Sequence, residues 1–407
     1  MANAFQTVST GVWNLKVFYQ GPLVDQFNED CPVYSMAEKS KFGWNGVQVN
    51  RPLRTIRNQG IGATADNGPL PAIGKQTGVQ AVINAKYNYL RFGITGPMIK
   101  SSQNDKGSFV RQAAYELEMG YKDLKSDCNR QNTWDGTSDL ALVATTAAAS
   151  TSISISGRES GEAALKFIDQ TMVIDIVSGS TGLLVASGIT VNAITSGTPL
   201  STTATLSLSA PVTVTANDII IRSGSLNNEV QGLLTQLDGN TTTVFGIDRS
   251  SYLSTQGNVL DLGGAQLQLI NLQSAWQYAK QRGGVDFMAV VSDFDSQTMY
   301  TKLLQSDKRY VNTDKGDGGF GSKDKMNLEY NGVPWYADKD CPRRIFFLPE
   351  GQIEKMVLAE MDFADETGSM MIAQVGTDAF EVRIRHFYNL FNSLASGSAV
   401  IRNYISP

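Results

Sequence analysis

The composition of the chain changes abruptly after Asp139, and this change divides the sequence into two kinds of material. Between Trp134 and Phe245 the one aromatic residue is Phe167, whereas aromatic residues are common on both sides. The segment 143–225 is instead rich in Ala, Ser, Thr, Val and Ile, in alternating runs broken by Gly, Pro and Asn-Asp. Such alternation is typical of short antiparallel strands. We therefore expect a β-rich domain at 143–225, inserted into a chain that afterwards regains its earlier character.

A disordered low-complexity linker is the alternative interpretation of this segment. The regular apolar alternation argues against it, because disordered linkers have too few apolar residues to form a core. We expect a short helix at 161–168, followed by runs typical of strands at 171–179, 181–194, 203–209 and 211–224.

The clearest helix in the sequence lies at 105–132. Its apolar residues recur at steps of three and four, which places them on one helical face. About 25 residues at 1.5 Å each make a rod of roughly 37 Å. A helix with one apolar stripe must pack against a sheet or another helix. The stripe consists of Val110, Ala113, Ala114, Leu117, Tyr121, Leu124 and Cys128.

Two segments before that helix read as extensions of the molecule. Residues 1–46 hold scattered aromatic residues with turn residues between them, which predicts an N-terminal arm. In 47–84, β-like runs at 47–57 and 78–83 flank a middle rich in Gly, Pro and Asn. This pattern predicts a two-stranded loop that projects from the body. A further strand is expected at 85–96.

After the insert, the pattern is mixed α+β. Helices are expected at 266–282, which ends in basic residues and Gly-Gly, and at 296–308. A buried strand is expected at 285–293, and a Gly/Asp/Lys loop at 315–325.

Length and charge exclude several classes of function. The chain has 407 residues, which suggests roughly two to three domains. Its net charge is −5, so it is not an arginine-rich nucleic-acid coat. An acidic surface repels packed DNA, which suits a container better than a binder. The single histidine, His386, excludes a multi-histidine metal site and leaves one imidazole for a catalytic triad.

The cysteines and the hydropathy pattern bear on where the chain folds. Cys31, Cys128 and Cys341 are odd in number and far apart, which argues against a disulfide framework or a metal knuckle. We therefore expect folding in a reducing compartment. The start of the sequence lacks a signal-peptide pattern, and no run approaches the ~18 apolar residues of a membrane span.

Two groups have side chains that occur in catalytic or metal sites, but the sequence near them does not supply the other residues of such a site. His386 would need a nucleophile and an orienting acid to act as a base, and nothing nearby in sequence supplies them, so a structural or interface role is expected. Asp338 and Asp340, on either side of Lys339, have the spacing to bind a hard cation on one side of a turn. A solvated turn is the favoured interpretation.

Three other motifs are weak signals. The glycine cluster GDGGFG at 316–321 resembles a phosphate loop but lacks the following Lys-Ser/Thr, so a surface loop is expected. The acidic run at 360–366 has the residues to hold Ca²⁺, although a solvated loop or a charge contact between subunits is favoured. Arg51, Arg54 and Arg57 suit phosphate or a neighbour's carboxylates, and the negative net charge favours subunit contact. We predict no catalytic, cofactor or metal site and no enzymatic activity.

The order of the elements resembles a known family. The segment 87–136, which reads YNYLRFGITGPMIKSS before the long helix, is similar to the peripheral strand and spine helix of the major capsid proteins of tailed double-stranded DNA bacteriophages, the Hong Kong phage capsid fold. The segment 309–356, with its glycine-rich loop and YNGVPW, resembles the late segment of that family. The positions of the arm and of the extended loop agree as well. The likeness covers nearly the whole chain except 143–225, and encapsulins share the fold.

The resemblance implies a division of the chain into five parts. The insert is not part of the minimal fold, and it is expected on the outer surface, where it would bind a decoration protein or brace neighbours. The parts are an N-terminal arm at 1–46, an extended loop at 47–84, a peripheral domain at 85–136 and 360–385, an axial domain at 137–142, 226–359 and 386–407, and the β-rich insertion domain at 143–225.

The resemblance also implies a structural function. Copies of the chain would form hexamers and pentamers of an icosahedral virion shell, assembled in the cytoplasm of the host bacterium around double-stranded DNA and without a membrane. The scaffolding segment of some relatives is missing, which implies a separate scaffolding protein or none; portal and decoration proteins are further partners that the resemblance implies. Relatives that cross-link covalently use a lysine of the extended loop, for which Lys75 is a candidate, but the Asn and Glu partners have no match and no cross-link is predicted.

Two alternatives remain open at this point. The first is an encapsulin-type shell around cargo proteins, which the insert and the length disfavour. The second is a β-rich adhesin or polysaccharide-binding tail protein, suggested by the Thr/Ser/Val strands. The lack of aromatic platforms in 143–225 weighs against sugar binding.

Overall fold

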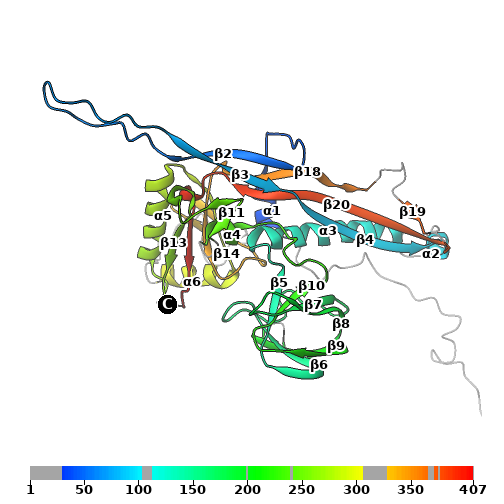
Figure 1. Cartoon of the computed structure of the whole chain (residues 1–407). Helices are drawn as coiled ribbons and strands as arrows, with labels where there is room; N and C mark the ends of the chain where they lie inside the picture. Colours follow the sequence, from blue (N-terminus) through cyan, green and yellow to red (C-terminus); the bar gives the residue numbers. More distant parts are fainter. Residues whose placement is uncertain are drawn as a thin grey trace, which may run out of the picture.

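The computed structural model describes residues 30–102, 112–198, 200–238, 242–305, 328–364, 371–374 and 376–406. Over these ranges the fold is α+β. It consists of a long sheet with a helix beside it, a second sheet flanked by helices, a projecting hairpin and a barrel (Figure 1). None of the described helices is long and apolar enough to span a membrane.

The long sheet is built around β20. Both β18 and β4 pair with β20 in antiparallel fashion, one on each side, and β1 joins β18 in parallel. Inward positions of β20 alternate along the strand, and Val382, Ile384, Tyr388 and Leu390 are buried there. The strands of this sheet are β1 (Glu38–Lys39), β4 (Lys86–Thr95), β18 (Ile353–Phe363), β19 (Met371–Ala373) and β20 (Ala379–Asn392).

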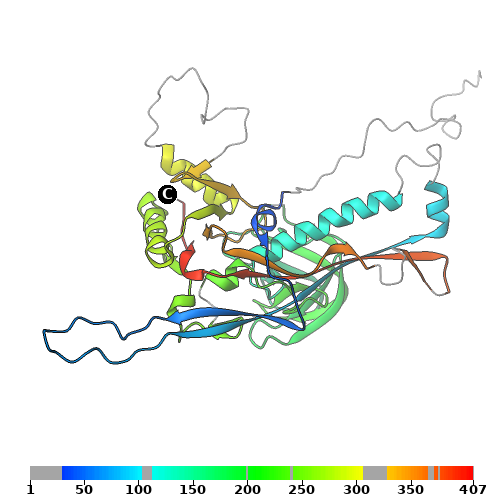
Figure 2. The same cartoon turned by 90° about the horizontal axis from the view of Figure 1, so that it is seen from above.

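The predicted long helix is present as α3 (Gln112–Thr133), which we call the spine helix, and it runs beside the long sheet (Figure 2). Leu124 and Cys128 of the predicted stripe are buried, but the prediction for Tyr121 is wrong, since 46% of it is exposed. Gly120 faces the sheet instead and lies so close to Leu90 that a Cβ would be 2.5 Å from its Cδ2 atom. The absence of a side chain brings helix and strand together at this point. Val110 of the stripe lies outside the described residues.

A second sheet, which we call the axial sheet, has the order β13-β21-β17-β14-β16-β15. Its central strands β14 and β17 are apolar runs buried almost throughout, as expected for strands covered on both faces. The helix predicted at 266–282 is α5, and Gly284 ends it with a φ of +70°. The elements of this part are β13 (Asn258–Asp261), α5 (Leu269–Gly283), β14 (Phe287–Ser292), α6 (Phe294–Gln305), β15 (Leu328–Tyr330), β16 (Val333–Ala337), β17 (Ile345–Pro349) and β21 (Ala399–Arg402).

The Ala/Ser/Thr-rich segment folds into a closed barrel with the strand order β10-β5-β6-β9-β8-β7. Isoleucine, leucine, valine and alanine fill its core, so aliphatic side chains suffice for a barrel this narrow. The strands are β5 (Asp139–Val143), β6 (Ala147–Ser156), β7 (Val173–Val177), β8 (Leu184–Ser196), β9 (Thr203–Val214) and β10 (Ile219–Arg222).

Two predictions about this segment are wrong. The barrel begins at Asp139 rather than at 143, because β5 is needed to close it and buries Leu140 and Ala141 in its core. Part of 137–142, expected in the axial domain, is therefore a barrel strand. No helix forms at 161–168, where the chain turns and inserts Ala164 and Ile168 into the barrel core.

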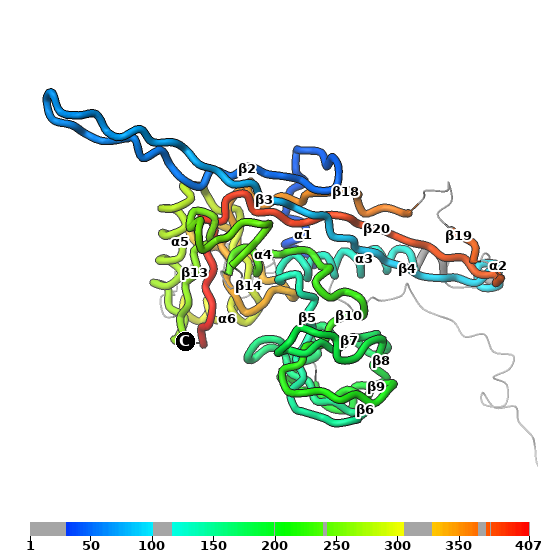
Figure 3. Tube along the Cα trace, in the orientation of Figure 1, coloured from blue at the N-terminus to red at the C-terminus, as the bar shows by residue number. Residues whose placement is uncertain are grey.

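The predicted projecting loop is a hairpin of β2 (Gln48–Ile56) and β3 (Thr77–Asn84), whose far end extends well beyond the body (Figures 1 and 3). Its base packs on β11 (Thr243–Val244), β12 (Ile247–Asp248) and Phe391. The barrel lies on the other side of the spine helix from this hairpin (Figure 1).

Short elements connect these parts. Helix α1 packs against the spine helix, and α2 leads from β4 towards it. The short elements are α1 (Pro32–Met36), α2 (Gly96–Ser102), α4 (Leu233–Leu237) and the 3₁₀ turns η2 (Leu253–Thr255) and η3 (Ala395–Gly397). The expected domain boundaries at 359/360 and 385/386 fall within the continuous strands β18 and β20, and the domain limits stay a prediction.

Gly232 gives a direct test of how tightly the spine helix meets α4. A Cβ at this residue would lie 2.4 Å from the carbonyl oxygens of Gln131 and Trp134. These are backbone atoms, so the Gly232→Ala variant must displace the helix end, and we expect it to lose about 1–3 kcal/mol of unfolding free energy. Urea unfolding of the purified chain measures this. The control is Gly43→Ala, where the added Cβ meets nothing within 4 Å, and equal midpoints for the two variants would contradict the packing.

Candidate assembly surfaces

The last turns of the spine helix are buried although they are polar. Arg130 forms a close ion pair with Glu229, and its Nε atom lies 3.1 Å from Oδ1 of Asp127. The Gln131 amide donates to Asn88 on β4 at 2.9 Å and to Asp127 at 2.8 Å. This cluster therefore joins the helix to the long sheet and to the segment that follows the barrel.

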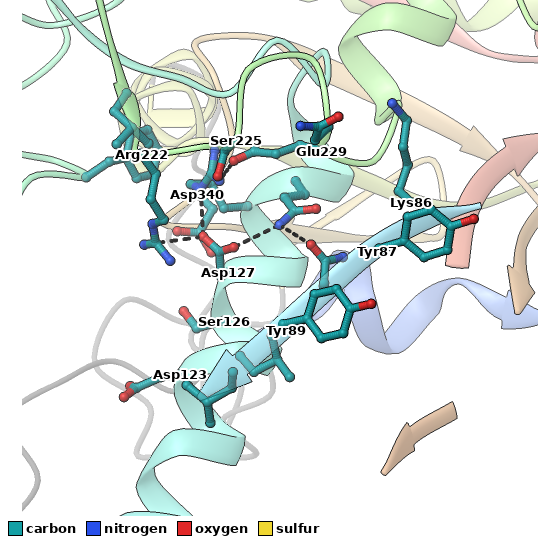
Figure 4. A pocket seen from close by; sticks show the side chains of 18 of the residues that line it. Lys86, Tyr87, Tyr89, Asp123, Ser126, Asp127, Arg222, Ser225, Glu229 and Asp340 are labelled. Carbon is teal, nitrogen blue, oxygen red and sulfur yellow. Dashed lines mark hydrogen bonds and ion pairs between the residues drawn. The ribbon is translucent and has the colours of Figure 1, made fainter. Parts of the chain in front are cut away.

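An open cleft of about 1350 Å³ separates the barrel from the spine helix and β4 (Figure 4). Arg222 of the barrel reaches across it to Asp127, with 3.6 Å between Nη2 and Oδ1. Burial alone would raise the pKa of Asp127, but Arg130, Arg222 and Gln131 outweigh burial and lower the pKa to about 2. Asp127 is therefore a fixed negative charge between two arginines.

A second ion cluster fastens the start of the barrel. Arg158 pairs closely with Asp135 and lies 3.2 Å from Asp139, and its guanidinium is 4.3 Å from the centroid of the Trp134 ring. The Asp139 carboxyl is so buried that its pKa is raised even with this arginine beside it. The charge of Arg158 thus stabilises two carboxylates at the point where the chain leaves the spine helix.

Further contacts join the barrel to the axial sheet. Arg344 lies 2.9 Å from Glu159 and 3.4 Å from Asp238, and Lys166 donates to the carbonyl of Cys341 at 2.9 Å. None of these residues is predicted from the sequence. The sequence holds one signal for these contacts, since five charged residues gather within 158–169 in a segment otherwise poor in charged residues.

The favoured interpretation of Asp338 and Asp340 as a solvated turn is wrong, because both are buried, with 1% and 6% exposure. The side-chain amide of Asn129 donates to both carboxylates at 2.8–3.0 Å, and Lys339 lies 2.9 Å from Asp340. Burial, together with the charge of Asp340, raises the pKa of Asp338 to about 6. The pair anchors the end of the spine helix to the axial part.

His386 is a buried member of β20. Its Nε2 atom lies 3.1 Å from the Tyr34 hydroxyl, its Nδ1 atom lies 3.1 Å from the Ala359 carbonyl oxygen, and its ring stacks on Tyr388. Burial lowers its pKa. These contacts hold α1 against the sheet, and none of them is with a nucleophile or a carboxylate.

The arginines of the hairpin differ from one another. Arg51 lies 3.3 Å from Glu354 on β18 and 4.5 Å from the Phe42 ring centroid, so its partner is within the chain. Arg54 and Arg57 are exposed, as is Lys75 nearer the far end. Subunit contact by Arg54 and Arg57 stays a prediction.

The far end of the hairpin exposes apolar side chains. Ile61, Leu70 and Ile73 are 86%, 86% and 103% exposed, and no other described element covers them. A two-stranded hairpin is marginally stable by itself in water, so these residues need a surface to cover them.

The remaining candidates do not form a site. Glu360 belongs to β18 rather than to a loop and pairs with Lys39, while 365–366 and the glycine cluster at 316–321 lie outside the described residues. All three cysteines are buried and free. Within the described part of the chain, no group of three or more His, Cys, Asp or Glu residues could hold a metal ion.

Removing Arg158 tests the joint between barrel and body. The Arg158→Leu variant leaves Asp135 and Asp139 without their shared cation, and we expect a loss on the order of 3 kcal/mol in unfolding free energy. Arg222→Leu is the control, because that side chain is 48% exposed and its ion pair is correspondingly weak. Urea unfolding compares the two, and a loss for Arg158→Leu no larger than the control's would rule out this role.

Asp338 predicts a dependence of stability on pH. Its pKa is about 6 in the folded chain against an ordinary value of 3.8. The folded chain therefore binds more protons between these values, and this residue makes stability fall as the pH rises from about 4 to 6. The Asp338→Asn variant should remove that fall, which is on the order of 3 kcal/mol.

Chemical unfolding at several pH values measures the effect. Asp286→Asn serves as the control, because the Asp286 side chain is 79% exposed. If Asp338→Asn and Asp286→Asn show the same pH profile as the unchanged chain, the buried pair does not titrate as described.

Comparison with known proteins gives matches in structure alone. No protein-family model matches the sequence, and no curated protein is similar to it. The capsid asymmetric unit of cyanophage A-1(L) matches with a TM-score of 0.62 over 98% of this chain and 99% of that one, at 12% identity. The capsid of a native GTA particle matches with a TM-score of 0.56 over 99% of this chain and 100% of that one, at 8% identity. A protein of Mycobacterium phage Bobi matches with a TM-score of 0.52 over 99% of this chain and 100% of that one, at 7% identity.

These matches cover nearly the whole length of both chains. At such identities they are evidence of a shared fold. They agree with the resemblance already visible in 87–136 and 309–356. The chain has the major capsid fold of the tailed double-stranded DNA bacteriophages.

Proposed function

We propose that this chain is the major capsid protein of a tailed bacteriophage and that it acts by assembly rather than by catalysis. Copies would form the hexamers and pentamers of an icosahedral virion shell, built in the cytoplasm of the host bacterium around the DNA genome. The end-to-end likeness in fold to capsid proteins supports a shell-forming role. Scaffolding, portal and decoration proteins are partners that we propose on the same basis.

The observation that carries the proposal is the hairpin. Its apolar end has no cover within the described part of its own chain, and it projects far from the body (Figure 1). A neighbouring copy related by symmetry would supply that cover, and each copy would give and receive the same contact. Because many such contacts act together, each one can be weak.

The two ends of the molecule are suited to different parts of such a shell. The long sheet and spine helix form an elongated arm, and the axial sheet lies in a body at its other end (Figure 2). We propose that axial parts gather around the five-fold and six-fold axes while the long sheets meet between them. The change on DNA filling would be a shift between two packed arrangements of these rigid parts.

Expression followed by negative-stain microscopy tests the proposal. Closed shells are expected from the full chain, expressed alone or with a scaffolding protein. A variant in which 60–74 is replaced by a short glycine turn should leave soluble subunits with an unchanged circular dichroism spectrum and no shells. Monomers of the full chain in light scattering, with or without a scaffold, would refute the proposal.

The contents of the particles separate this proposal from its alternatives. Packaged double-stranded DNA in particles purified from infected cells supports a capsid, whereas a protein cargo would show an encapsulin-type compartment. Binding on a glycan array by a chain that forms no shells would favour the adhesin or tail protein.

A further inference from the structure

A small cavity lies at the base of the hairpin. Its volume is about 240 Å³, it is partly open to solvent, and it is lined by β2, by β11 and β12, and by the end of β20. Leu53, Phe245 and Phe391 give it apolar walls, and Ser254 and Thr255 also line it. Its size suits one side chain, since pockets for whole small molecules usually measure about 300–1,000 Å³.

Arg249 lines this cavity and is buried, with 5% of its surface exposed. One nitrogen of its guanidinium, Nη2, donates to the carbonyl oxygen of Gln236. The other, Nη1, is buried and has no hydrogen-bond partner among the residues that the structure describes. Arg249 is therefore a nearly buried cation beside the pocket, and one of its donors is unused.

The carboxylates nearest in sequence are directed elsewhere. Asp248 is bonded to the hydroxyls of Ser250 and Ser251. Asp238 is paired with Arg344 and Arg402. Burial, with no compensating charge, lowers the pKa of Arg249 to about 10, which still leaves it positively charged at neutral pH.

A buried charge without a partner is costly. Arg130, the other arginine that is almost fully buried in the described part of the chain, has Glu229 beside it. An isolated buried charge destabilises a fold, and a well-packed apolar side chain in its place often increases stability. Arg249 is thus unfavourable without a partner, and the residues that the structure describes do not supply one.

We propose that the cavity binds a carboxylate side chain of a neighbouring copy, with Arg249 as the group that receives it. This inference rests on the proposed shell. The cavity lies where the hairpin leaves the body, and the hairpin is the element proposed to contact neighbours. The chain has 39 acidic and 34 basic residues, so a neighbouring copy offers somewhat more carboxylates than cations. The planar guanidinium matches a carboxylate with two parallel hydrogen bonds.

The Arg249→Met variant tests this proposal, because it should affect subunit stability and shell assembly in opposite directions. Unassembled subunits should unfold at the same or a higher temperature than the unchanged chain, because an unpaired buried charge is lost. Assembly should become weaker, and the subunit concentration at half-assembly should rise by about 30-fold or more, as expected for loss of a buried charge pair. Thermal unfolding and light scattering measure the two effects.

Arg344→Met is the matched control, because its carboxylate partners lie within the chain. It should lower the unfolding temperature of the unassembled subunit, unlike Arg249→Met. If Arg249→Met destabilises the subunit as much as this control, or leaves assembly unchanged, Arg249 is not a receptor for a neighbour.

Small anions distinguish the source of the charge. Sodium acetate should raise the unfolding temperature of the unassembled chain above that in sodium chloride of equal ionic strength, and should have no such effect on Arg249→Met. A larger effect of sodium phosphate than of acetate would overturn the carboxylate assignment in favour of a free-anion site. The acetate measurement is made on unassembled chains and does not depend on shell formation. If the unchanged chain fails to assemble, the proposed function is refuted, whereas binding at this cavity is still tested by acetate.

Discussion

The structure depends on the need to satisfy buried polar groups at the C-terminal end of the spine helix. Asn129, Arg130 and Gln131 follow one another there, and all are buried. Each finds its partners in a different part of the chain: Asn129 in the axial part, Arg130 in the segment after the barrel, and Gln131 in the long sheet. An unpaired polar group at such a depth costs more than the hydrogen bond is worth. These contacts therefore join the axial part, the segment after the barrel and the long sheet at one end of the spine helix.

Much of the fold was predictable because it rests on periodicity. The spine helix, α5, the buried strand β14 and the projecting hairpin each have a pattern that local sequence reveals, and the aromatic-poor segment is a β-rich unit as predicted. The errors have common causes. β5 was missed because the residues at 139–143 form a strand only when β10 pairs with them, and that partner is far away in sequence. Tyr121 has the spacing of the apolar face, but the hydroxyl-bearing ring lies towards solvent, and the small Gly120 makes the contact.

The assembly surfaces were less predictable than the fold. Asp338 and Asp340 look like residues of a solvated turn, and no local signal shows that Asn129 meets them across more than 200 residues. Arg249 was equally hard to predict, because it stands out only through the lack of a carboxylate partner among the described residues around it. The fraction of charged residues is low, at 18%, which agrees with the proposal that contacts between copies cover part of the surface of each chain.

The barrel enters and leaves the rest of the chain at one place, because its first strand, β5, pairs directly with its last, β10. A closed barrel has no free strand edge, so its strands need no hydrogen-bond partners from the surrounding sheets. A unit with adjacent ends can be lost, gained or exchanged for another such unit without stretching the polypeptide that holds it. The junction between β5 and β10 therefore offers a position at which a foreign domain can be grafted while the rest of the fold stays as it is.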